Sequence, residues 1–357
     1  MEWSQEYNIL FAFLTSLLVT AFSIPTIINV AKMKHLYDEP NPRKLHHSNV
    51  PTLGGLAILL GFFISMSFWT NFTYCWHLQY VITACIIVAV IGIKDDIVGL
   101  SPMKKFIGQL LAAITMVVWG DIRITSWFNI FGVNDLPFLV SIAFSIFTVL
   151  VIINAFNLID GIDSLAASLG IISSLVFGIY FYFFDVEYQH AILSFALAGS
   201  LFGFLYFNKT PAKIFMGDTG SMLLGLLMSM FAIEFINIEQ SSTTAFFRHC
   251  SAPTLAMSVI FVPLYDVLRV FSIRLFYGRS PFAPDKNHLH HLLLNMGFSH
   301  TKATIILSLF SILLMIIAYL FQFKGNYWIG FIMLMLCLLF TLWVYLGSKK
   351  KLSQKKV

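Results

Sequence analysis

Residues 137–165 read PFLVSIAFSIFTVLVIINAFNLIDGIDSL, an apolar run that ends in a series of polar residues. No charged side chain occurs in residues 137–154, and a helix needs roughly 20 apolar residues to cross the hydrocarbon core of a bilayer. The stretch therefore predicts a membrane-spanning helix that carries polar side chains to one membrane surface.

The rest of the chain repeats this organisation. Apolar residues make up 58% of the 357 residues and charged residues only 11%, whereas soluble domains carry about 25% charged residues. We predict an all-α polytopic membrane protein that forms one membrane-embedded domain over residues 1–357. Its eleven predicted spans are the apolar runs at 8–30, 53–71, 79–93, 106–119, 137–154, 165–183, 190–207, 220–238, 253–276, 303–322 and 328–346.

Positive charges are distributed unevenly between the two sets of connecting segments. If the N-terminus lies outside, the inner segments hold 19 of the 22 lysines and arginines, and only Arg123, Arg248 and Lys324 lie outside. Because positively charged loops stay on the cytoplasmic side, this predicts an external N-terminus and a cytoplasmic C-terminus. No basic residue precedes the first apolar run, which indicates an uncleaved span rather than a signal peptide.

The predicted outer segments and the tail offer few further features. Residues 120–136 alternate in a way that predicts a small external hairpin. The four cysteines show no metal-binding spacing; Cys75 and Cys250 share the predicted outer side, so a disulfide stays open beside isolated thiols. The basic tail after the last span is interpreted as a cytoplasmic anchor, not as a patch for nucleic acid.

Acidic residues gather at the inner ends of spans, where an ionisable group is costly and a functional role is the default hypothesis. Asp95 and Asp96 follow the third predicted span. Neighbours on a helix point about 100° apart, so we expect these two carboxylates to have different partners. They suit a base beside a metal or phosphate site, and the alternative is a solvated helix cap.

Asn154, Asn157, Asp160 and Asp163 recur at every third position. In an α-helix such a stripe drifts by about 60° per step, whereas in a 3₁₀ turn it stays on one face; Gly161 permits a local break of this kind. The segment has no lysine or arginine, so its carboxylates need a metal or a basic group from elsewhere. Carboxylate and amide oxygens suit Mg²⁺.

Two other inner segments offer sites for phosphate. In residues 215–221, FMGDTGS, Asp218 lies between two glycines. Either Asp218 or Thr219 caps the next span, or the segment holds a magnesium-bound pyrophosphate at a helix N-terminus. In the first inner segment, Arg43, Lys44 and His46 either hold phosphate or form a positively charged anchor loop.

Residues 281–291 read PFAPDKNHLHH. Three histidines within four positions raise the option of zinc, but no cysteine or Glu-x-x-His partner supports it. Hydrogen bonds from histidine and lysine to a phosphate are the better interpretation.

Together these motifs resemble those of the polyprenyl-phosphate N-acetylhexosamine-1-phosphate transferases of glycosyltransferase family 4. The resemblance runs from about Asp38 to Leu294 in the same order. It rests on Asp95-Asp96, Lys105 with Gln109, the run from Asn154 to Asp163, and Met216 to Ser221.

The terminal motif separates the branches of this family. Asp285-Lys-x-His-x-His-His291 and Arg43-Lys-x-His46 are similar to the branch of WecA and TagO rather than to the related MraY-type enzymes. Ser164 stands where a glycine is common in the family, a replacement that we expect to be tolerated.

The resemblance implies a reaction and a location. A UDP-N-acetylhexosamine, most often UDP-GlcNAc in this branch, would donate its sugar 1-phosphate to undecaprenyl phosphate. UMP would leave, and the lipid-linked pyrophosphoryl sugar would start a cell-surface polysaccharide. The enzyme would need Mg²⁺, with Mn²⁺ as a substitute, and would lie in the bacterial cytoplasmic membrane with its active site on the cytoplasmic face. Homodimers occur in the family, and no nucleic acid partner is implied.

Motif position also implies roles. Asp218 would bind Mg²⁺ with Asn157 as second ligand, Asp95 would deprotonate or position the lipid phosphate, and Asp96 would support it or hold the metal. A covalent role for one of the paired acids stays open. The implied substrate-binding residues are Lys105, Asn154, Asp160, Asp163, Arg43, Lys44, His46, Asp285, Lys286, His288, His290 and His291.

Other classes fit less well. A secondary transporter keeps its ionisable residues near the bilayer midplane between repeated halves, whereas here they lie at span ends and no repeat is visible. A CDP-alcohol phosphotransferase would continue its Asp-Gly with Ala-Arg, but Asp160-Gly161 is followed by Ile-Asp-Ser-Leu. The GxxxxGK[ST] loop of ATPases is absent from the sequence. The sequence leaves the hexosamine and the glycan pathway undetermined.

Overall fold

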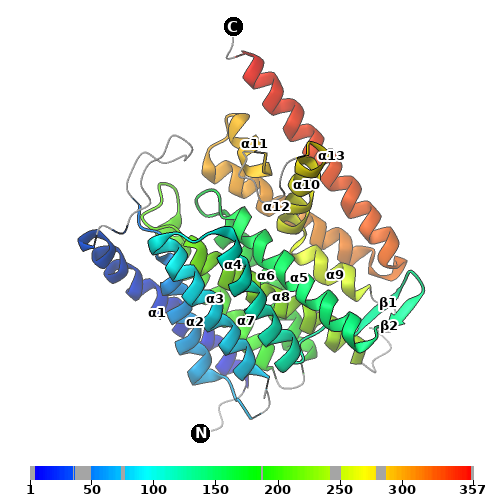
Figure 1. Cartoon of the computed structure of the whole chain (residues 1–357), viewed down its shortest axis with the longest axis horizontal. Helices are drawn as coiled ribbons and strands as arrows, with labels where there is room; N and C mark the ends of the chain where they lie inside the picture. Colours follow the sequence, from blue (N-terminus) through cyan, green and yellow to red (C-terminus); the bar gives the residue numbers. More distant parts are fainter. Residues whose placement is uncertain are drawn as a thin grey trace.

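The computed structural model describes residues 5–34, 36, 50–73, 77–185, 188–241, 251–278 and 287–354. Within these ranges the chain is a bundle of helices with one antiparallel two-stranded hairpin (Figure 1). The elements are α1 (Gln5–Met33), α2 (Gly54–Trp69), α3 (Leu78–Val98), α4 (Pro102–Ile114) with a π-helical continuation (Thr115–Trp119), β1 (Ser126–Ile130), β2 (Val133–Asp135), α5 (Phe138–Ile159), α6 (Leu165–Phe184), α7 (Gln189–Asn208), α8 (Gly217–Ser241), α9 (Ala252–Val259), α10 (Phe261–Phe276), α11 (Leu289–Asn295), α12 (His300–Leu320), a 3₁₀ turn (Gln322–Lys324) and α13 (Asn326–Gln354).

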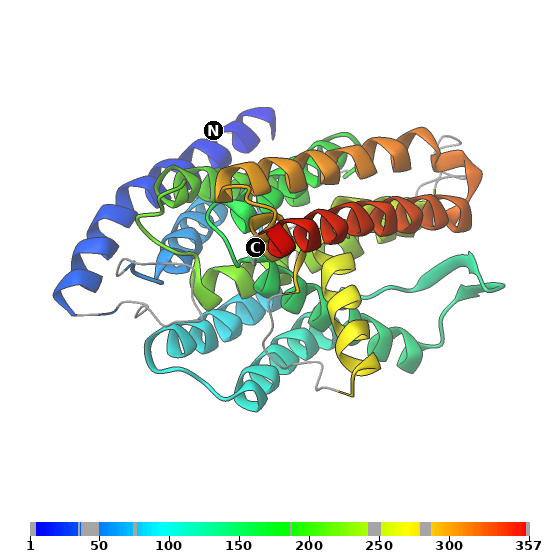
Figure 2. The ribbon, with the colours of Figure 1, turned by 90° about the horizontal axis from the view of Figure 1, so that it is seen from above.

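The helices α8 and α7 form the centre of the bundle. Within the described residues, 83% of the α8 span and 72% of the α7 span are buried, against 22% for α1 and α13. The central α8 packs against α3 and α5, and α7 packs against α1 and α6. Figures 1 and 2 show α1 along one flank and the hairpin projecting from the opposite flank, with α12 and α13 running beside each other.

The predicted all-α membrane class is confirmed. Each of the eleven predicted spans falls on helical residues, and α1, α5, α6, α7, α8, α12 and α13 are long and apolar enough to cross a membrane. That makes seven among the described residues, or eight if the bent pair α9–α10 is one span. The chain is therefore a multi-pass membrane protein, while the count of eleven and the orientation stay predictions.

The predicted span 253–276 is not one straight helix. It divides into α9 and α10, which meet at Ile260 with a bend of 85°. Pro263 explains the break, because its ring clashes with the carbonyl four residues earlier, at Val259, and it has no N–H to donate. The helix α9 accordingly ends at Val259.

The hairpin is confirmed where the sequence predicted it. Its strands lie within residues 120–136, with Ser126 opposite Asp135 and Ile130 opposite Val133. Cys75 and Cys250 lie outside the described residues, so the disulfide remains open.

Close packing of α1 on α7 depends on two small residues. Gly199 and Gly203 lie one turn apart on α7; a Cβ atom added at Gly199 would lie 2.2 Å from the Phe13 carbonyl oxygen, and one at Gly203 would lie 2.7 Å from that of Leu17. Pairs of small residues at this spacing let membrane helices approach closely, so that van der Waals contact holds them together. The lipid-exposed α1 is held to the bundle in this way.

We expect Gly199→Leu to push α1 away from α7 and to lower the free energy of unfolding by about 1–3 kcal/mol, measured by thermal unfolding in detergent. Gly330→Leu on α13 is the control, since a Cβ there meets no atom within 4 Å. An unfolding midpoint unchanged in Gly199→Leu would show that this contact does not hold α1.

Candidate active site

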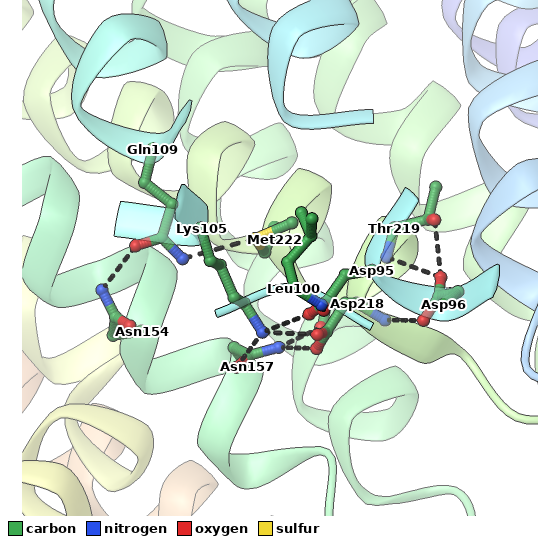
Figure 3. A network of polar contacts seen from close by, with 11 residues as sticks. Asp95, Asp96, Leu100, Lys105, Gln109, Asn154, Asn157, Asp218, Thr219 and Met222 are labelled. Atoms are coloured by element: carbon green, nitrogen blue, oxygen red, sulfur yellow. Dashed lines mark hydrogen bonds and ion pairs between the residues drawn. The ribbon is translucent and has the colours of Figure 1, made fainter. Parts of the chain in front are cut away.

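The site forms where the ends of α3 and α5 meet the starts of α4 and α8 (Figure 3). Asp95 and Asp96 lie in the last turn of α3, and Asn157 lies in the last turn of α5. Lys105 lies in the first turn of α4, and Asp218 in the first turn of α8. Helix ends thus bring together side chains that are far apart in the sequence.

The ammonium group of Lys105 lies at the centre of the polar network (Figure 3). Its Nζ lies 3.3 Å from Asp95 Oδ2 and donates to Asn157 Oδ1, also at 3.3 Å. It pairs more closely with Asp218 Oδ2. The Asn157 amide donates to Asp218 Oδ1 and, at 2.8 Å, to Ser221 Oγ. Three oxygens from three helices therefore converge on one cation.

Asp96 has different partners from Asp95, as expected for neighbours on a helix. Its Oδ1 accepts from the Asp218 backbone N–H at 2.8 Å, and its Oδ2 accepts from the backbone N–H and the hydroxyl of Thr219 at 3.1 and 2.6 Å. A carboxylate is favourable at this position, the positive end of the α8 dipole. Asp96 therefore caps α8 from a neighbouring helix, and Asp218 and Thr219 are donors rather than the caps that the sequence allowed.

The capping of α8 by Asp96 requires a glycine at position 217. Its φ is +72°, in the left-handed region that glycine adopts freely. A Cβ atom there would lie 2.7 Å from both carboxylate oxygens of Asp96 and 2.1 Å from the Thr52 carbonyl oxygen. The chain can enter α8 along Asp96 only without a side chain at this position.

The start of α2 holds the same loop. Gly54 N donates to the Phe215 carbonyl at 2.9 Å, and Gly55 N donates to the Met216 carbonyl at 2.8 Å. Because neither residue has a side chain, the backbone of α2 can approach that of the loop and of α8 closely.

A cavity of about 310 Å³ opens beside the network. Asp160 and Asp163 lie on its wall, in the turn between α5 and α6. The polar stripe therefore runs off the end of α5 at Ile159 into a turn and forms no 3₁₀ helix. The lining residues are Thr52, Asp95, Asp96, Asn157, Asp160, Gly161, Ile162, Asp163, Asn208, Phe215, Gly217 and Asp218.

Five carboxylates line this cavity, and Lys105 pairs with two of them. Loss of solvation, together with the charges of Asp218, Asp96 and Asp163, raises the pKa of the Asp160 carboxyl group well above its usual range. Among the described residues, the carboxylates that line the cavity outnumber the one lysine that pairs with them, and a bound cation would offset this excess of negative charge.

His288 anchors the start of α11. Its Nδ1 lies 2.9 Å from Asp266 Oδ2, and the Asp266 carboxylate also accepts from Leu289 N and, at 2.7 Å, from Arg269 Nη2. His288 is buried and does not line the cavity. Its role in substrate binding stays a prediction, and its observed contacts are structural.

His290 lies closer to the cavity. A Cβ atom on Gly161, a lining residue, would lie 2.3 Å from His290 Nε2, so the imidazole packs against the cavity wall. Burial lowers the pKa of His290 well below its usual range, which favours the neutral ring. The ring of His291 follows at 4.3 Å between centroids.

Asn154 lies outside the lining. Its amide donates to Gln109 Oε1 at 3.0 Å and to the Leu150 carbonyl at 2.8 Å, joining α5 to α4. A substrate contact by Asn154 stays a prediction. Five further predicted binding residues lie outside the described residues: Arg43, Lys44, His46, Asp285 and Lys286.

The sequence assigned no role to Asn208, Asp266 or His300. Asn208 joins the α5–α6 turn to the loop before α8, since it accepts from Ser164 N at 2.8 Å and donates to the Ile214 carbonyl at 2.9 Å. His300 Nδ1 lies 3.5 Å from the carboxylate of Asp163. The only local signal for these residues was a polar side chain near the end of an apolar run.

Comparison with known proteins identifies the family. The description of glycosyl transferase family 4 matches residues 78–236, which include the whole Lys105 network. A decaprenyl-phosphate N-acetylglucosaminephosphotransferase of Mycobacterium leprae is 34% identical over 315 residues, which cover 83% of this chain and 79% of that protein. The chain belongs to glycosyl transferase family 4.

Two further relatives agree with this membership. The enzyme of the same name from Mycobacterium tuberculosis H37Rv is 35% identical over 315 residues, or 83% of this chain and 78% of that protein. The undecaprenyl-phosphate alpha-N-acetylglucosaminyl 1-phosphate transferase of Escherichia coli K12 is 32% identical over 302 residues, or 83% and 79%. The family predicted from the motifs is confirmed.

We expect Asp96→Ala to lower the free energy of unfolding by about 1–2 kcal/mol, because two N–H groups of α8 lose their acceptor. The measurement is thermal or denaturant unfolding of the detergent-solubilised protein. Thr219→Val, which removes only the hydroxyl donor, should cost less. If Asp96→Ala were as stable as the wild type, Asp96 would not be the cap that holds α8.

Proposed function

We propose that this chain is a membrane-embedded phosphoglycosyltransferase. It transfers N-acetylglucosamine 1-phosphate from UDP-N-acetylglucosamine to undecaprenyl phosphate and releases UMP. The observation that carries the proposal is the convergence of Asp95, Asn157 and Asp218 on Lys105 beside a carboxylate-lined cavity. The relatives' names describe transfer of this kind of group to polyprenyl phosphates.

The outer face of α4 suits a lipid acceptor. Met103, Phe106, Ile107 and Leu111 are exposed large apolar side chains at helical spacing, so they share one face. Lys105 is on the same short helix and points into the polar network. A phosphate could therefore meet Lys105 while its isoprenoid chain stays in lipid beside α4.

The reaction forms one bond and breaks one bond. An oxygen of the lipid phosphate attacks the β-phosphorus of the UDP-sugar, and the bond from that phosphorus to the oxygen shared with UMP breaks. A phosphate monoester has a second pKa of about 6, so the acceptor is mostly dianionic at neutral pH. We assign Asp95 chiefly to positioning the acceptor through Lys105, with proton removal as the lesser task.

Mg²⁺ is the proposed cofactor, with Mn²⁺ as a substitute, and the residues present fit it. The oxygens of Asp218 and Asn157 already converge on one cationic group, and hard oxygen ligands are those that Mg²⁺ prefers. When bound, the ion would neutralise the donor pyrophosphate and polarise the β-phosphorus. Lys105 would then be released to contact a phosphate.

We also propose that the site faces the cytoplasm, in the cytoplasmic membrane of a bacterium. The distribution of lysine and arginine supports this orientation, since 19 of the 22 lie in the connecting segments on the side of the site. A UDP-sugar made in the cytoplasm would reach the cavity directly from that side.

The purified protein, incubated with undecaprenyl phosphate and a panel of UDP-sugars, should release UMP and form lipid-linked pyrophosphoryl N-acetylglucosamine from UDP-N-acetylglucosamine. Lys105→Ala should lower the rate by about 100-fold or more, because charge-stabilising groups in such sites contribute on that scale. Asp121→Asn, in the segment that carries the hairpin, should leave the rate unchanged. Absence of UMP with every UDP-N-acetylhexosamine tested would refute the proposed reaction.

Chelation with EDTA should abolish UMP release, and added Mg²⁺ should restore it. Asn157→Ala should raise the Mg²⁺ concentration needed for half-maximal rate by about 10–100-fold, the usual effect of weakening a metal site. The concentration dependence of the rate is the measurement, with Asp121→Asn again as the control. A full rate in EDTA would rule out the metal while leaving the transfer itself in place.

A further inference from the structure

A second cluster of titratable side chains lies at the end of the bundle away from the active site. His77 directly precedes α3, His190 lies in the first turn of α7, and Glu234 lies near the end of α8. Glu234 is sixteen residues beyond Asp218 on the same helix, or about 24 Å along its axis. The three residues offer ligand atoms that all lie within 4.8 Å of one another.

Asp185 fixes the orientation of His190. The ring Nδ1 lies 3.1 Å from Asp185 Oδ2, and the same oxygen accepts from the backbone N–H of His190 at 3.0 Å. A carboxylate paired with one ring nitrogen selects the tautomer whose other nitrogen carries a free lone pair, as in metal-binding histidines. The contact with Asp185 thus leaves His190 Nε2 with a lone pair that can accept a hydrogen bond or bind a metal.

His190 Nε2 is buried and lacks a hydrogen-bond partner, and the residue is only 7% exposed. Buried polar atoms are nearly always satisfied, so such an atom calls for a specific explanation. Since Nδ1 is engaged by Asp185, Nε2 is the atom that His190 can offer to the cluster. An electron-pair acceptor at this point would satisfy it.

The other two members complete a donor set. The His77 ring lies nearly parallel to that of His190, with an interplanar angle of 10° and 5.9 Å between centroids. Both rings interact electrostatically with Glu234 and Asp185. Glu234 places a carboxylate within the apolar α8 span, where an ionisable group is costly and a functional role is therefore the default hypothesis.

We propose that His77, His190 and Glu234 bind a zinc-class divalent ion. Two imidazoles and one carboxylate with an open fourth position are a donor set of Zn²⁺, whereas Mg²⁺ and Ca²⁺ prefer oxygen ligands. Ligand atoms in a tetrahedral zinc site lie about 3.3 Å apart, so small side-chain shifts from the observed separations suffice. With water in the fourth position, the ion would tie together the starts of α3 and α7 and the last turns of α8; α3 and α8 carry Asp95 and Asp218 at their other ends.

The test measures zinc in protein purified without a polyhistidine tag, because other histidines of the chain also take up zinc. After incubation with Zn²⁺ and gel filtration, the wild type should retain about one ion per chain more than His77→Ala or Glu234→Gln, by elemental analysis. Zn²⁺ should raise the wild-type unfolding midpoint by several degrees, and Mg²⁺ should not. Asp121→Asn, a carboxylate substitution away from the cluster, should behave as the wild type.

Equal zinc retention by the wild type and both variants would overturn the proposal and leave a hydrogen-bonded cluster. If either variant is not recovered folded, X-ray absorption of the wild type carrying one equivalent of Zn²⁺ decides. Two imidazoles with oxygen ligands support the site, and a shell of oxygens alone or of three imidazoles overturns it. The proposal does not depend on the transferase reaction, so neither outcome bears on that assignment.

Discussion

The hydrogen bonds from the first N–H groups of α8 to the carboxylate of Asp96 are the interaction on which the candidate active site depends. The most buried span of the bundle begins there, and its first free N–H groups have no partner within their own helix. Asp96 supplies the acceptor from α3 and thereby sets the position of Asp218. Gly217 leaves room for that contact. One hydrogen-bonded cap therefore links the core of the fold to the residue proposed to bind the metal.

The second constraint on the site is the charge of the carboxylates that line its cavity. Five carboxylates around one cavity repel one another, and Lys105 offsets only part of that charge. Burial, together with the charges of Asp218, Asp96 and Asp163, raises the pKa of Asp160. A site of this kind would suit the proposed cation together with an anionic substrate, because each would make the binding of the other more favourable. The oxygens of Asp218 and Asn157, which now contact Lys105, are those proposed to hold the metal.

Polar groups lie near both ends of α3 and α8, in an otherwise apolar environment. At one end, Asp95 and Asp218 meet Lys105. At the other end, Glu234 of α8 meets His190 of α7 and His77 before α3. Because a helix bends little over this length, fixing its far end limits how far the end that carries Asp218 can tilt. A metal at the far end would therefore support the geometry of the site without taking part in the reaction.

The sequence by itself determined the membrane class, the helical nature of the eleven apolar runs and the family. These follow from local composition and from motifs that are contiguous in the chain, such as Asn154 to Asp163. It also predicted different partners for Asp95 and Asp96 from helical periodicity alone. The bend at Ile260 was missed, although Pro263 carried the signal for it.

Only the tertiary structure decided which polar residues meet. The cap by Asp96, the tie between Asn154 and Gln109, the anchoring of His288 by Asp266, and the far cluster all join residues from different helices. Each contact depends on how a helix is rotated about its axis and where it begins. Packing among several helices sets both quantities, and no single stretch of sequence contains that information.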